Sequence, residues 1–266
     1  MMLVLVLALF LAGVPVVSAS ALQDTGAEQE VALGNAAYAQ FDNQTALQHF
    51  LNALKQDPNN FQALWKGARA YADVGKTFEK TQKDKAKALY LSGDTLARQV
   101  VKLYPDSADA HFVLAMCVGR VALFEGGKTK IRLSKEVKAE ADKAIALNPN
   151  HDGAYHIIGR WNYNIATLSG VLKFFAKVIY GGVPPGASLE EAARMFAKAI
   201  EINGDKPIHR LEYGRTLIEL EQYSAAREQL QKCIDLPQAQ WDDPTSKEEA
   251  AKLLKEIAGK QDKTSM

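Results

Sequence analysis

The chain has little excess of charge of either sign, since its 266 residues carry a formal net charge of only +1. Proteins that bind nucleic acid usually show a strongly basic balance or face, so the composition does not favour a nucleic-acid partner. Cysteine is also scarce, with Cys117 and Cys233 alone in the whole sequence. A small disulfide-stapled scaffold is therefore excluded. The hydrophobic share of 47% and the charged share of 24% are those of an ordinary globular protein.

The motifs of common catalytic and metal sites are missing too. The sequence contains no HExxH, no CxxC and no nucleophile elbow. A GKT triplet ends at Thr129, but a phosphate-binding loop needs glycine where Ala122 stands and a strand before it. His151 and His156 are five residues apart, a spacing that does not place both on one helical face. We expect no metal, no cofactor and no enzymatic activity.

The amino-terminal residues have the pattern of a targeting segment. Leu3 to Val17 is apolar, and Ala19, Ser20 and Ala21 form an A-x-A cleavage site. The apolar run is too short for an ordinary membrane span. We interpret residues 1–21 as a cleaved signal peptide and the protein as exported, either periplasmic or secreted. No lysine or arginine precedes the run, so an uncleaved segment that anchors the protein to a membrane is the alternative.

One helical pattern returns along the chain at about the 34-residue period of tetratricopeptide repeats. That repeat has a small residue at position 8, where two helices cross, a small residue at position 20, an aromatic at position 24 and proline near position 32. Gly34, Ala46, Phe50 and Pro58 match all four positions. Such repeats stack into a curved array whose concave face binds a ligand, usually a peptide.

The residues at position 32 give the number of repeats. They are Pro58, Pro105, Pro149, Gly204 and Gln238. Their separations of 47, 44, 55 and 34 residues indicate repeats enlarged by insertions of 13, 10 and 21 residues, followed by one of the standard length. Ser246 can cap a last helix from Lys247 to Ala258. The predicted fold is all-α, a tetratricopeptide-like right-handed superhelix of about five helix hairpins with a C-terminal capping helix, spanning residues 22–258. Residues 259–266 are expected to be a disordered tail.

The sequence of the fourth repeat is more distinctive than the general tetratricopeptide pattern. It contains the run Ala154 to Trp161, the triplet Leu168 to Gly170 and the run Ala176 to Gly182. With the upstream segment His111 to Arg120, this stretch resembles the regulator of microtubule dynamics family of tetratricopeptide-like proteins. The resemblance implies a non-enzymatic helical-repeat adaptor, and it implies association with microtubules, organelle contacts and phospholipid. Together with the leader, it favours a bacterial exported member of this family.

The longest insertion, residues 165–180, contains an apolar stripe. Leu168, Leu172, Phe175 and Ile179 follow helical spacing. We expect this helix to pack on the enlarged fourth repeat, or to flank an apolar ligand or touch a membrane. The lysine-rich insertions around residues 76–87 and 128–130 are expected to solvate their helices, and the alternative is that they face an anionic surface.

Positions 5, 9, 12 and 13 of the first helices predict the surface of the concave groove. They supply arginines suited to carboxylate or phosphate, together with aromatic walls. The predicted groove residues are Asn35, Tyr38, Trp65, Arg69, Phe112, Met116, Arg120, His156, Arg160, Tyr163, Asn164 and Arg215. The function predicted from them is a scaffold that holds a protein or peptide with an anionic group. Two alternatives remain open: a phospholipid or acyl ligand that uses the same groove together with residues 165–180, and arginines that only pair internally with Asp73, Glu212 or Glu219.

Overall fold

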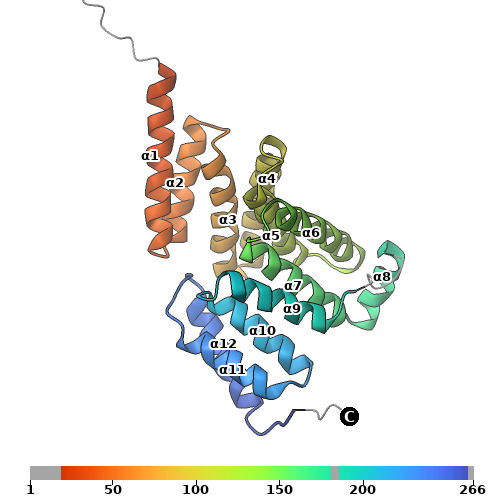
Figure 1. Ribbon diagram of the computed structural model, residues 1–266. Coiled ribbons are helices and arrows are strands. Elements are labelled where there is room, and N and C mark those ends of the chain that lie inside the picture. The colour runs from red at the N-terminus through yellow and green to blue at the C-terminus, as the bar shows by residue number, and fades with distance from the viewer. Residues whose placement is uncertain (1–18, 181–185, 263–266) are drawn as a thin grey trace, which may run out of the picture.

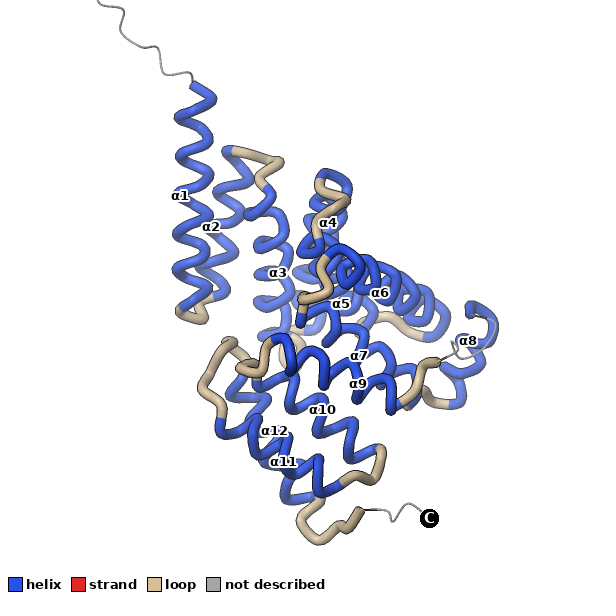
Figure 2. Tube along the Cα trace, in the orientation of Figure 1, coloured by secondary structure: helices blue, strands red, loops and turns tan. Residues whose placement is uncertain are grey.

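The computed structural model describes the backbone of residues 19–180 and 186–262, and side chains from residue 26 onward except 175, 176, 179 and 180. This part of the chain contains twelve helices and no strand (Figures 1 and 2). The helices are α1 (Ala19–Ala39), α2 (Asn43–Gln56), α3 (Phe61–Phe78), α4 (Lys83–Leu103), α5 (Ala108–Ala122), α6 (Gly127–Leu147), α7 (Asp152–Ala166), α8 (Gly170–Tyr180), α9 (Leu189–Ile202), α10 (Pro207–Glu219), α11 (Tyr223–Asp235) and α12 (Asp243–Glu256).

The helices pair as five consecutive hairpins. Helices α1 and α2, α3 and α4, α5 and α6, α7 and α9, and α10 and α11 contact one another, and each hairpin packs on the next. Helix α12 packs on α10 and α11 and ends the array, as Figure 1 shows in blue. The prediction of an all-α tetratricopeptide-like superhelix with five hairpins and a capping helix is therefore confirmed. The predicted start of the capping helix is wrong, because α12 already begins at Asp243 and Ser246 lies inside it instead of capping it.

Small residues lie where the helices of a hairpin cross. A Cβ atom on Gly34 would lie 2.6 Å from Phe50 Cε1, and one on Gly159 would lie 2.7 Å from Phe196 Cε1. These distances are shorter than any ordinary carbon contact, so each ring occupies the space that a side chain would need. Phe50 and Phe196 are almost fully buried. The small residue at position 8 and the large residue at position 24 are thus two halves of one contact.

The first two insertions lengthen helices instead of forming loops. Helix α3 continues to Phe78, and α4 and α6 have 21 residues each. In the extension of the second hairpin, a Cβ atom on Gly75 would lie 2.6 Å from Tyr90 Cε1. The added residues therefore repeat the small-to-large crossing of the ordinary repeat. The extended helices bury the Tyr90 ring in the largest apolar cluster, which spans α3 to α7.

The third insertion forms the separate helix α8, which contacts α6 at the edge of the molecule (Figure 1). This helix carries exposed apolar side chains, since Val171, Phe174 and Val178 are 69%, 64% and 61% exposed. The predicted stripe residues Phe175 and Ile179 lie outside the described side chains. None of the helices in the described part of the chain combines the length and the apolar composition that a bilayer span needs.

Both cysteines are buried free thiols in different repeats, Cys117 on α5 and Cys233 on α11. The predicted signal peptide lies outside the described residues up to residue 18, and Ala19 to Ala21 begin α1. Its cleavage and the predicted export stay predictions, as does the disorder of residues 259–266.

Candidate binding groove

A large groove, with a volume of about 730 Å³, opens between the middle hairpins in the described part of the chain. Its wall comes mainly from the first helices of the middle hairpins, α3, α5 and α7, and from the beginning of α10. Residues of α6 and the insertion extend the lining. This location agrees with the general behaviour of helical repeats, whose curvature creates a concave binding surface.

Most of the predicted groove residues line this space. They are Trp65, Arg69, Phe112, Met116, Arg120, His156, Arg160 and Asn164. All eight come from positions 5, 9 and 13 of the three middle repeats. These positions are four residues apart, so they lie on one face of each helix. The structure thus brings together the side chains of a single stripe in three neighbouring layers.

The other four predicted residues are not among the lining residues, and they contact neighbours in the array. The Asn35 side chain accepts a hydrogen bond from Lys66 at 2.8 Å, and the Tyr38 hydroxyl donates to Asp73 at 2.8 Å. Tyr163 lies 3.3 Å from Glu219. These residues belong to position 12 or to a terminal repeat, which the groove does not reach.

Arg215, the fourth of these residues, is held by two carboxylates. Its Nε atom lies 3.6 Å from Glu212 Oε2, and its Nη2 atom lies 3.7 Å from Glu249 Oε1. The same Glu212, nearly fully buried, binds Arg160 Nη1 at 2.5 Å. Glu212 therefore bridges the arginines of two neighbouring repeats.

The internal pairing differs among the arginines that line the groove. Arg69 Nε lies 3.8 Å from Asp73, and Arg120 Nη1 lies 3.8 Å from Glu79, both beyond hydrogen-bond length. Arg160 is paired closely with Glu212, but its side chain is still 43% exposed. The lining contains six lysine and arginine residues against four aspartates. Glu79 and Glu212, which pair with Arg120 and Arg160, offset this excess of two positive charges. The groove is therefore close to neutral overall.

A polar cluster that the sequence did not predict lies at the junction of α7 and α10. Asp152 Oδ2 lies 2.5 Å from Lys206 Nζ and 2.9 Å from His209 Nε2. His209 Nδ1 in turn lies 2.9 Å from His156 Nδ1. All four residues line the groove. A signal existed, since Asp152 and Lys206 both stand at the start of a first helix, but the prediction considered only positions 5, 9, 12 and 13.

The loop between α11 and α12 returns to the amino-terminal half of the chain. Asp242 forms an ion pair with Lys76 on α3, and the Lys76 ammonium lies 5.8 Å from the centroid of the Trp241 ring. Gln240 and Asp242 also line the large groove. The sequence did not predict this contact, because it joins residues 166 positions apart.

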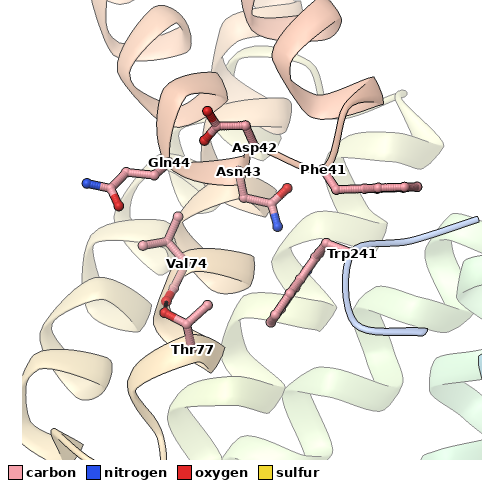
Figure 3. Close-up of a pocket in the computed structure, with 7 residues that line it drawn as sticks. All are labelled: Phe41, Asp42, Asn43, Gln44, Val74, Thr77 and Trp241. Carbon is pink, nitrogen blue, oxygen red and sulfur yellow. Dashed lines mark hydrogen bonds between the residues drawn. The ribbon is translucent and has the colours of Figure 1, made fainter. Parts of the chain in front are cut away.

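The same loop bounds a second, smaller pocket of about 190 Å³. Figure 3 shows Trp241 facing the turn before α2, with Phe41 above it and the Asn43 amide directed between them. Phe41 has a positive φ of 64°, a backbone region that bulky residues rarely adopt. The C-terminal loop therefore meets the first hairpin as well as α3.

Sequence comparison adds a relationship that covers nearly the whole chain. The family described as Regulator of microtubule dynamics protein 1-3 matches residues 34–258. Regulator of microtubule dynamics protein 1 of Bos taurus is 30% identical over 234 residues, which are 88% of this chain and 73% of that protein. The Mus musculus protein of the same name is 29% identical over 240 residues, 90% of this chain and 78% of that protein.

Among solved structures, the chain is similar to a tetratricopeptide-repeat protein from Thermus thermophilus. The TM-score is 0.62 at 16% sequence identity, and the match covers 85% of this chain and 98% of that chain. At this level of identity, the similarity concerns the fold alone.

Proposed function

Because the chain belongs to the regulator of microtubule dynamics protein 1-3 family, with the fold of a helical-repeat scaffold, we propose that it is a non-enzymatic scaffold that holds an anionic peptide or protein partner in its concave groove. The observation that carries this proposal is the arginine stripe formed by Arg69, Arg120 and Arg160 in three successive layers. A guanidinium group presents a planar fork of donors that fits carboxylate or phosphate.

The internal ion pairs of these arginines are compatible with ligand binding. Glu212 engages the Nη1 atom of Arg160 and thereby orients the side chain. Arg69 and Arg120 lie 3.8 Å from their carboxylates, so a ligand can approach them without breaking a short hydrogen bond. The aromatic side chains Trp65 and Phe112 lie along the same face and supply apolar contact area.

Binding of a labelled octaglutamate peptide tests the proposal. We expect Arg120→Glu and Arg160→Glu each to weaken binding more than tenfold, which corresponds to about 1.4 kcal/mol. Arg194, 71% exposed at its side chain on α9 and not among the groove-lining residues, provides the matched control. Arg194→Glu should leave binding unchanged, and added salt should weaken binding to the native protein. Full affinity in both groove variants, with melting temperatures like that of the native protein, would refute the proposed site.

The same purified protein can be used to test the alternative ligand, a phospholipid or acyl chain. Organic extraction of the purified chain followed by mass spectrometry would detect a lipid that copurifies in stoichiometric amount. A peptide-binding scaffold should yield none. Detection of a bound lipid would contradict the proposed peptide ligand and support the lipid alternative.

We further propose that the protein is exported and cleaved near Ala21. The apolar run and the A-x-A sequence support this proposal. Amino-terminal sequencing of protein from its native host is the test. A chain that still begins at Met1 would rule out cleavage and favour a membrane anchor.

A further inference from the structure

The polar cluster at the junction of α7 and α10 forms a chain of hydrogen bonds with a definite direction. Asp152 accepts from His209 Nε2 at 2.9 Å, and His209 Nδ1 lies 2.9 Å from His156 Nδ1. His209 is 2% exposed, so water does not compete for these contacts. The chain begins at a carboxylate and ends at the imidazole of His156, which lines the groove.

The charges around the cluster favour an ionised aspartate and two neutral histidines. Burial alone would raise the pKa of the Asp152 carboxyl, but the hydrogen bond from His209 and the Lys206 ammonium hold it below its usual value. Burial lowers the pKa of His209, although Asp152 opposes the shift. Burial, with the positive charges of Arg160 and Lys206 nearby, lowers the pKa of His156 well below its ordinary value.

These contacts determine which nitrogen of each ring carries the proton. An ionised carboxylate can only accept, so His209 donates from Nε2, and its Nδ1 atom is left as an acceptor. His156 must then donate from Nδ1 to His209. The Nε2 atom of His156 consequently carries a lone pair, and no hydrogen bond engages it among the described residues. It is the free acceptor atom of a residue that lines the groove.

Arg160 lies one helical turn further along α7. Residues four apart on a helix lie on the same face, about 5–6 Å apart at their Cβ atoms. Only the Nη1 atom of Arg160 binds Glu212 within the described part of the chain, so Nε and Nη2 remain as donors. The face of α7 thus offers an acceptor at His156 beside donors at Arg160.

We propose that His156 and Arg160 form a recognition pair for polypeptide, in which His156 Nε2 accepts a hydrogen bond from a backbone N–H and Arg160 binds a carboxylate of the same ligand. This inference rests on the proposed function of the groove and names the chemistry of the ligand there. An anion without N–H groups satisfies Arg160 but leaves the acceptor of His156 unpaired. The pair therefore distinguishes an acidic peptide from other polyanions.

The protonation pattern can be measured without a ligand. Long-range ¹⁵N–¹H correlation spectra of the full chain at pH 7.5 report which imidazole nitrogen bears the proton, with His156→Phe and His209→Gln used for assignment. We expect the proton of His156 on Nδ1 and that of His209 on Nε2. A proton on Nε2 of His156 would overturn the inference and leave the proposed function of the groove intact.

Two probes of similar charge test the recognition itself: octaglutamate and an oligomer of acrylic acid with eight carboxylates. His156→Phe keeps a ring against Phe196 but removes the acceptor. We expect this variant to weaken the binding of octaglutamate more than tenfold and to change the affinity for the acrylate oligomer by less than twofold. His49 on α2 is not among the groove-lining residues, so His49→Phe, the matched control substitution, should change the affinity for neither probe.

The two proposals fail in different ways. If Arg160→Glu weakens both probes but His156→Phe affects them equally, the recognition pair is wrong and the anionic groove stands. If neither probe binds the native chain, both the anionic groove and the recognition pair are wrong. A difference between the probes cannot come from a general loss of structure, because unfolding would reduce both affinities.

Discussion

At the scale of single residues, the stability of this protein depends on pairs of one small and one large side chain. Gly34 and Gly159 each lie under a phenylalanine ring, and Gly214 lies under Leu230, at distances that leave no room for a Cβ atom. Well-packed interiors tolerate added atoms poorly, because the neighbours must leave their preferred rotamers. These three hairpins therefore each depend on a glycine that leaves room for the large side chain opposite it.

Two glycine substitutions should have opposite effects on the free energy of unfolding. Gly159→Ala places a Cβ atom 2.7 Å from Phe196 and should destabilise the protein by about 1–3 kcal/mol. Gly119→Ala on α5 meets only Val137 at 3.7 Å, an ordinary contact. Since alanine is the better helix former, this variant should be up to about 1 kcal/mol more stable. Urea unfolding measures both, and equal effects would contradict the assigned crossing.

The buried histidines should make the protein less stable in mild acid. In the unfolded chain a histidine titrates near pH 6.5, whereas the pKa values of His156 and His209 are lowered by burial in the folded protein. Below pH 6.5 the unfolded state binds more protons, so the free energy of unfolding falls as the pH falls. Above pH 6.5 both states are neutral and this effect is absent.

The slope of this pH dependence is at most about 1.4 kcal/mol per pH unit for each histidine that stays neutral. The lowered pKa of Asp152 acts in the same direction, but only below about pH 4. Urea unfolding at pH 7.5, 6.5 and 5.5 measures the slope, which His156→Phe should reduce. An identical slope in the variant would show that folding does not change the pKa of His156.

At the scale of helices, side-chain caps mark several of the starts. Asp42, Asn60, Ser107 and Ser188 each accept a hydrogen bond from a backbone N–H three residues on, before α2, α3, α5 and α9. Such caps satisfy donors that a helix leaves unpaired at its beginning. Helix α8 differs from these elements because no capping contact is described for it and its outer face is apolar.

Polar substitutions should distinguish the outer face of α8 from the core beneath it. Val171 and Val178 are more than 60% exposed, whereas Ile165 on α7 is 2% exposed. Val171→Gln with Val178→Gln should change the free energy of unfolding by less than about 0.5 kcal/mol. Ile165→Gln should cost about 2–4 kcal/mol because it buries an amide without a partner. Thermal unfolding checks both, and a large loss in the α8 variant would mean that its outer face is packed in solution.

At the scale of the whole molecule, the array does not end as an open spiral. The loop before α12 brings Asp242 to Lys76 and Trp241 to the first hairpin, so residues near both ends of the sequence meet (Figure 3). In a simple repeat array each unit contacts only its neighbours. This contact adds a long-range connection and places Asp242 at the rim of the groove.

Reversing the charge of Asp242 should test its contact with Lys76 on α3. Asp242→Lys sets two ammonium groups against each other and should cost roughly 1–2 kcal/mol, between the ranges for exposed and buried pairs. It should also increase the radius of gyration in small-angle X-ray scattering. The double variant Lys76→Asp with Asp242→Lys restores the opposite charges and should recover both values. A double variant no better than the single one would contradict the pairing.

The sequence by itself determined the repeat, the five hairpins, the capping helix and most of the groove stripe. Each depends on spacing within a single repeat, and the positions of Gly34, Phe50 and Pro58 follow from how two adjacent helices cross. The stripe at positions 5, 9 and 13 follows from the helical period of a single element. Local periodicity therefore sufficed for these features.

The tertiary structure alone decided the hydrogen-bond chain from Asp152 to His156, the bridging role of Glu212 and the contact of Asp242 with Lys76. These contacts join residues from 52 to 166 positions apart, and their geometry depends on how much each layer rotates against the next. The repeat pattern specifies each layer, whereas side-chain packing between the layers determines which charges meet.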